Sequence, residues 1–170
     1  MKPSGCILWI CVLLSPAGAS AHKSRRSYDP QAPIRSLLMG WTHSIEKRDL
    51  DGVMSAYLPS NELTVYDGIP PLAYRGPGSL RNNFRDFFSR FSGPLAIEYR
   101  DLHIVAGPAV AFAYGLQKIS GTLTNGSQKA TWVRFTQGYR HIRGRWYAVH
   151  DHVSVPADPI TGKALYNLKP

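Results

Sequence analysis

Cysteine is almost absent from this chain of 170 residues, because only Cys6 and Cys11 occur and both lie close to the N-terminus. The chain that follows them contains no thiol, so it can form neither a disulfide nor a thiolate centre. Its fold must therefore depend on an apolar core, for which Leu, Val, Ile, Tyr, Phe and Trp residues are plentiful.

Long apolar stretches are missing as well. The run Ile7–Leu14 is too short to span a bilayer. It follows Lys2 and precedes small residues between Ala17 and Ala21, a pattern typical of a cleavable export signal. We therefore expect residues 1–21 to be a signal peptide, the protein to be secreted or periplasmic, and no stable insertion into a membrane.

Acidic residues are scarce, since 11 Asp and Glu stand against 20 Lys and Arg, and the formal net charge is +9. Clustered basic residues would suggest nucleic-acid binding. Here they are scattered, except in residues 22–30, which we expect to form a flexible basic tail, and no recognition motif accompanies them. The composition therefore favours a solvated basic surface and no nucleic-acid partner.

Apolar residues at helical spacing predict three helices in the N-terminal half. The first is expected over residues 31–47. The second begins at the capping residue Asp49 and ends before Pro59. The third begins at Gly76 and carries apolar residues as far as Phe91.

Downstream of the third helix the apolar period changes to two. This period predicts four long strands over residues 95–105, 109–121, 128–141 and 145–155. A further short strand is expected over residues 63–66. This order indicates an α+β fold with three N-terminal helices packed on a strongly bent, mostly antiparallel sheet. Such a bend leaves a cone-shaped cavity, which is a usual ligand site.

The last strand carries side chains suited to chemistry. Strict alternation puts Trp146, His150, His152 and Ser154 on one face and Asp151 on the other. The two imidazoles could be structural groups, ligand contacts or proton donors and acceptors. As metal ligands they would need a third protein ligand, which the spacing does not supply.

On the preceding strand, Trp132, Arg134 and Thr136 share a face. If this face points inward, the Arg134 guanidinium binds an anion or pairs with a carboxylate such as Asp151 or Glu98. If the face points outward, both interpretations fail.

Asp67 follows the first strand among apolar neighbours. Desolvation there would raise its pKa and make it a general base near neutral pH, whereas its place before Gly68 is also typical of a simple turn. Trp41 on the first helix and Tyr57 on the second are expected either to pack in the core or to line the cavity.

Several short patterns together resemble the SnoaL-like group of the nuclear transport factor 2-like superfamily. They are Arg48-Asp49-Leu50-Asp51, Val65-Tyr66-Asp67, Tyr74-Arg75-Gly76 and the ending Trp146-x3-His150-x-His152-x-Ser154-x-Pro156. The resemblance covers about residues 31–156 and leaves 157–170 as a C-terminal tail. It implies the cone-shaped fold and commonly a homodimer through the sheet, while function varies within the superfamily.

Matched to ketosteroid isomerase, Asp67 falls on the proton-shuttling carboxylate, Trp41 close to the oxyanion-hole tyrosine, and Thr136 near the protonated acid beside it. The ending is also similar to that of the association domain of the calcium/calmodulin-dependent kinase. That similarity implies a binding role for Arg134, His150 and Ser154.

The sequence therefore favours a cofactor-independent protein that binds a small apolar or anionic ligand bearing a carbonyl or carboxylate, with isomerase-like or cyclase-like proton transfer. The expected catalytic residues are Asp67, His150 and His152, and the expected ligand-binding residues are Trp41, Tyr57, Trp132, Arg134, Thr136 and Ser154. The alternatives are a non-catalytic homodimerising module with a vestigial pocket and, third, a metal hydrolase.

Overall fold

The computed structural model describes residues 28–170. The expected signal peptide over 1–21 and most of the expected basic tail over 22–30 lie outside the described residues. Within the described part of the chain, no helix is both long enough and apolar enough to cross a membrane.

Three helices form, close to where the apolar spacing predicts them. Helix α1 spans Ala32–Lys47 and buries Ile34, Leu38, Trp41 and Ile45 along one side. A residue every three or four positions returns to the same face, so this stripe packs as a unit on the sheet. Arg48 ends the helix in the left-handed conformation.

Helix α2 spans Leu50–Ser55, and the Asp49 side chain caps it by accepting a hydrogen bond from Gly52 N at 2.9 Å. The sequence predicted that this helix continues as far as Pro59, but it ends at Ser55. The reason is that Leu58 N donates to Ala148 O and Ala148 N donates to Ala56 O, so the chain leaves the helix to pair with a strand.

Helix α3 spans Gly76–Ser89. The sequence predicted that the apolar stripe of this helix includes Phe91, but Phe91 is the first residue of a strand. Arg90 is the C-cap, and its carbonyl accepts a hydrogen bond from Thr124 N, which turns the chain directly into the sheet.

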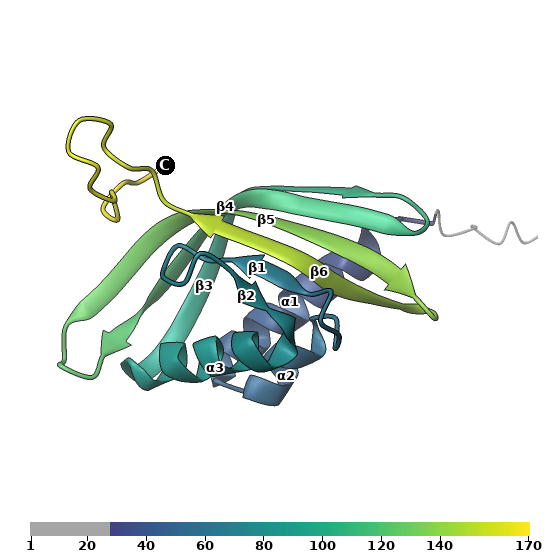
Figure 1. The fold of residues 1–170 in the computed structure, drawn as a ribbon, viewed down its shortest axis with the longest axis horizontal. Coiled ribbons are helices and arrows are strands. Elements are labelled where there is room, and N and C mark those ends of the chain that lie inside the picture. The colour runs from purple at the N-terminus through teal and green to yellow at the C-terminus, as the bar shows by residue number, and fades with distance from the viewer. Residues whose placement is uncertain (1–27) are drawn as a thin grey trace, which may run out of the picture.

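The sheet has six strands in the order β2-β1-β6-β5-β4-β3. Their bounds are β1 Thr64–Tyr66, β2 Tyr74–Arg75, β3 Phe91–Ala106, β4 Val110–Leu123, β5 Gln128–Ile142 and β6 Arg145–Ser154. Neighbouring strands are antiparallel, except that β1 runs parallel to β6. Figure 1 shows the helices together beneath one face of the curved sheet, which confirms the expected α+β arrangement. The two-residue strand β2 was not predicted, because two residues show no period.

A bulge in β6 changes which side chains share a face. Gly138 pairs with His150 and Tyr139 pairs with Ala148, so Val149 is the extra residue. As a result, Trp146 packs against the core, while His150 lies on the opposite face. Strict alternation had placed these two residues on one face, and that prediction is wrong because a bulge shifts the period by one residue.

A cavity with two carboxyl groups as the candidate functional site

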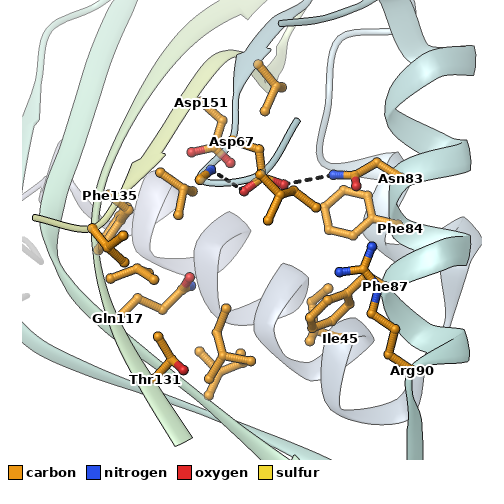
Figure 2. A pocket seen from close by; sticks show the side chains of 18 of the residues that line it. Ile45, Asp67, Asn83, Phe84, Phe87, Arg90, Gln117, Thr131, Phe135 and Asp151 are labelled. Carbon is orange, nitrogen blue, oxygen red and sulfur yellow. Dashed lines mark hydrogen bonds between the residues drawn. The ribbon is translucent and has the colours of Figure 1, made fainter. Parts of the chain in front are cut away.

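A largely apolar cavity of about 200 Å³ lies between the helices and the concave face of the sheet (Figure 2). Its walls include Phe84 and Phe87 from α3, Ile97 from β3, and Val133 and Phe135 from β5. An apolar cavity of about 150 Å³ can hold benzene. This one therefore has room for a molecule somewhat larger than a single aromatic ring.

Asp67 lines this cavity directly after β1, as predicted. One carboxylate oxygen, Oδ1, accepts a hydrogen bond from Gly68 N at 2.7 Å, and the other, Oδ2, accepts one from Asn83 Nδ2 at 2.9 Å. Asp67 thus has the turn role considered in the sequence analysis and also reaches the cavity. Two neutral donors fix the carboxylate and leave other lone pairs for a ligand.

Asp151 is a second carboxyl group in the same cavity, and sequence reasoning missed it. It is only 5% exposed. Its Oδ2 accepts hydrogen bonds from Tyr57 Oη at 3.0 Å and Gln137 Nε2 at 2.8 Å, whereas its buried Oδ1 has no partner among the described residues. A buried carboxyl oxygen without a donor is costly unless a ligand or a proton satisfies it.

Burial raises the pKa of Asp151 from 3.8 to about 6. The hydrogen bonds from Gln137 and Tyr57 act in the opposite direction, and the charge of Asp67 raises the pKa further. Desolvation dominates because the charged form loses more hydration than two neutral donors return. Asp151 therefore changes protonation state close to neutral pH, in the range useful for acid–base chemistry.

Neutral phenols support this carboxyl group. Burial is the main reason that the pKa values of Tyr57 and Tyr139 lie well above 10, so both hydroxyl groups remain protonated and can donate. Tyr139 donates to Gln137 Oε1 at 2.5 Å, which orients the Gln137 amide so that its nitrogen faces Asp151. The network fixes the position of Asp151 Oδ2.

Trp41 supplies the other unpaired polar atom. Its indole Nε1 is buried and has no hydrogen-bond partner within residues 28–170. The ring meets Phe84 edge to face, with 6.2 Å between the ring centroids, and it lines the same cavity. Trp41 and Asp151 thus both line the cavity, and each has one buried polar atom without a hydrogen-bond partner among the described residues.

Comparison with known proteins shows the family. The model of the SnoaL-like domain matches residues 34–158, well over half of the chain. The chain belongs to the SnoaL-like domain family. No significant match is found among curated proteins.

Solved structures share this fold. A nuclear transport factor 2-like protein of unknown function from Pseudomonas putida is 28% identical, with a TM-score of 0.74, and the match covers 82% of this chain and 96% of that one. A proposed calcium/calmodulin-dependent protein kinase II association domain from Xanthomonas campestris is 16% identical, with a TM-score of 0.66 and coverages of 80% and 93%. A proposed dehydratase from Streptomyces avermitilis is 14% identical, with a TM-score of 0.66 and coverages of 76% and 98%.

Three of the residues expected in the site of this SnoaL-like domain do line the cavity, namely Trp41, Tyr57 and Asp67. The six others lie on β5 and β6 and do not line it: Trp132, Arg134, Thr136, His150, His152 and Ser154. The expectation that Arg134, His150 and His152 share a cavity with Asp67 is therefore wrong. On β5 the cavity instead receives the odd-numbered side chains, including Thr131, Val133, Phe135 and Gln137.

The two histidines lie on the outer side of the sheet, beside Tyr66. His150 Nδ1 lies 2.9 Å from Thr64 O, and the Tyr66 ring centroid is 5.1 Å from that of His150 and 6.1 Å from that of His152. This arrangement matches the structural role left open for them in the sequence analysis. Within the described residues, no group of three or more potential metal ligands is assembled.

Arg134 also points outward and is exposed. Neither carboxylate considered for it is its partner, because Glu98 pairs with Lys118, and Asp151 is bonded to Tyr57 and Gln137. Thr136, which the family match had placed near a protonated acid, faces away from the cavity as well. In this SnoaL-like domain, the carboxyl group that lines the cavity together with Asp67 is Asp151.

Proposed function

We propose that this SnoaL-like protein binds a small, mainly apolar molecule bearing a carbonyl group and catalyses proton transfer at the carbon next to that carbonyl. One observation carries the proposal: a single, largely apolar cavity is lined by two carboxyl groups, one of them with a pKa near neutrality, and by Trp41, whose indole N–H has no partner among the described residues. Perturbed acids in a cavity are typical of catalytic sites.

Asp67 is the base in this proposal. Its carboxylate takes a proton from the carbon next to the carbonyl, and the C–H electron pair moves toward the carbonyl oxygen to give an enolate. The Trp41 N–H donates a hydrogen bond to this oxygen, and the neutral form of Asp151 donates a second one or a proton. The carbonyl reforms when Asp67 returns its proton to carbon and any proton given by Asp151 returns from the oxygen to Asp151, which completes an isomerisation or an exchange and needs no cofactor.

The test is the exchange of carbon-bound hydrogen for deuterium in a cyclic ketone such as cyclohexanone, followed by proton NMR in heavy water. The purified protein is expected to accelerate the loss of the α-proton signal above the buffer rate. Because the neutral form of Asp151 is the donor, the rate should decline as the pH rises through about 6. No acceleration across a panel of enolisable ketones would leave only ligand binding.

A second candidate is a homodimerising module, favoured by aromatic groups on the outer face of the sheet. His103, Phe112 and Tyr114 stack there, with neighbouring ring centroids 5.0 and 5.9 Å apart, and Phe112 is 43% exposed. Exposed apolar patches of this kind mark association surfaces, and two-fold self-association is the commonest form.

Sedimentation equilibrium tests the dimer. The wild-type protein is expected at twice the chain mass, whereas Phe112→Glu should sediment as a monomer because it places a charge in the contact. A monomeric wild type would remove the dimer proposal. If the wild type is dimeric but accelerates no exchange, the non-catalytic module is the better description.

A further inference from the structure

Two cationic side chains, Arg90 and Lys129, line the same cavity from different layers of the fold. Arg90 is the C-cap of α3, and Lys129 lies at the beginning of β5. The sheet brings them to the same end, because Arg90 O accepts from Thr124 N while Lys129 pairs with Gly121 on the same strand hairpin. Figure 2 shows the Arg90 guanidinium beside Phe87, directed toward the cavity.

No carboxylate of the described residues forms an ion pair with either cation. The ion pairs within residues 28–170 use Arg81, Lys118 and Arg140 instead. Both residues are exposed, and both line the cavity. Two cations without a carboxylate partner among residues 28–170, in a mainly apolar lining, attract an organic anion.

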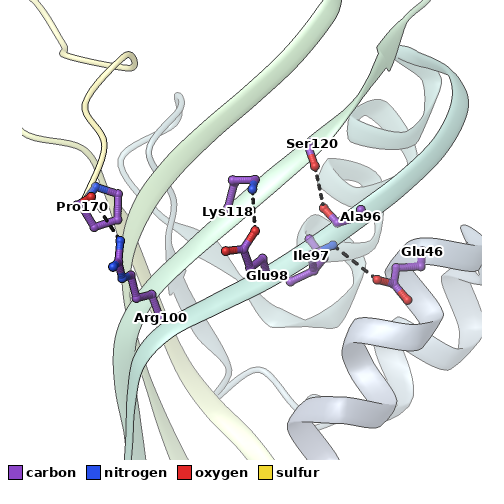
Figure 3. A network of polar contacts seen from close by, with 8 residues as sticks. All are labelled: Glu46, Ala96, Ile97, Glu98, Arg100, Lys118, Ser120 and Pro170. Atoms are coloured by element: carbon purple, nitrogen blue, oxygen red, sulfur yellow. Dashed lines mark hydrogen bonds and ion pairs between the residues drawn. The ribbon is translucent and has the colours of Figure 1, made fainter.

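The C-terminal segment contributes to this end of the cavity. Tyr166 lines it, and its ring centroid lies 5.7 Å from Lys129 Nζ, within the range of a cation–π contact. The segment is anchored by Leu165 N, which donates to Pro156 O at 2.8 Å, and by Arg100, which donates to Pro170 O at 3.1 Å (Figure 3). The tyrosine therefore restrains the lysine where the cavity opens.

We infer that the ligand is an organic acid whose anionic group is bound by Arg90 and Lys129 while its apolar body fills the cavity. The Asp67 carboxylate lies in the same lining, so it repels a ligand carboxylate from its own part of the cavity and fixes the orientation. This inference rests on the proposed function, because it concerns the same cavity. It specifies the substrate class as an organic carboxylate whose carbonyl group lies at the opposite end of the molecule, inside the cavity.

The experiment compares two probes of the same shape, 2-naphthoate and the neutral 2-naphthamide, by titration calorimetry at pH 7.5. The wild-type protein is expected to bind the anion more tightly than the amide, and added salt should reduce the difference. Arg90→Gln and Lys129→Gln should each weaken naphthoate binding about tenfold and leave naphthamide binding unchanged.

Arg85→Gln is the matched control. Arg85 lies on α3, the helix that Arg90 caps, and it is exposed. Its side chain donates a hydrogen bond to Asn82 Oδ1 and does not line the cavity. It should leave both affinities unchanged. Equal wild-type affinity for the two probes, or an equal loss in Arg85→Gln, would overturn the anion site alone. If neither probe binds, both this inference and the proposed cavity function are overturned.

Discussion

Replacing Asp67 by Asn is expected to slow catalysed α-proton exchange about 10²- to 10⁴-fold, the usual contribution of a positioned general base. The amide has almost the same shape, and its oxygen can still accept from Gly68 N, as the carboxylate does at 2.7 Å. Asn83 can rotate its own amide to present oxygen to the new NH₂ group. Loss of the base is therefore the main consequence, and NMR exchange rates measure it.

Two controls separate catalysis from folding. Asp51→Asn makes the same chemical change at an exposed carboxylate paired with Arg81, and it should leave the exchange rate unchanged. Binding of 2-naphthamide should be the same in Asp67→Asn as in the wild type, which shows that the cavity is intact. An Asp67→Asn rate within threefold of the wild type would remove Asp67 as the base.

Asp151→Asn is expected to stabilise the protein at neutral pH while weakening its chemistry. The folded-state pKa of about 6 lies above the ordinary value of 3.8, so the native state binds more protons than the unfolded state between these pH values. The free energy of unfolding therefore falls as the pH rises from 3.8 to about 6. Above that range, the carboxylate costs about 3 kcal/mol.

Asparagine removes most of this cost, because its oxygen can accept from Tyr57 and Gln137 in place of Oδ2. A gain of about 2 kcal/mol at pH 7 is expected, since the amide nitrogen remains without an acceptor in the cavity. Urea unfolding at pH 7 and pH 4 measures it, and the gain should vanish at pH 4. A variant less stable than the wild type at pH 7 would show that Asp151 ionises without this cost.

Much of the fold could be predicted because most of its signals are local. The helical stripe of α1 and the Asp49 cap of α2 each need only a few neighbouring residues to be recognised. The strand periods of β3 to β5 are similarly visible. The early end of α2 could not be predicted, because hydrogen bonds with Ala148, far along the chain, decide it.

The site was only partly predictable. The position of Asp67 after a short strand is a local signal in the sequence. Asp151 gives no such signal, because it lies between His150 and His152, and alternation favours a site on the face of these histidines. The inward face of β5 and β6 depends on how the sheet bends and on the bulge opposite Gly138, and alternation alone assigns neither. Gln137 on the neighbouring strand pairs with Asp151, and the two form the polar part of that face.

Strand β1 gives the outer face of the sheet a direct mechanical link to the cavity. His150 contacts the Thr64 carbonyl, Tyr66 pairs with His152, and the next residue along the chain is Asp67. A displacement of the outer imidazoles would therefore act on β1, the strand that leads directly into Asp67. If two copies meet on that face, association itself would adjust the alignment of Asp67 in each of them.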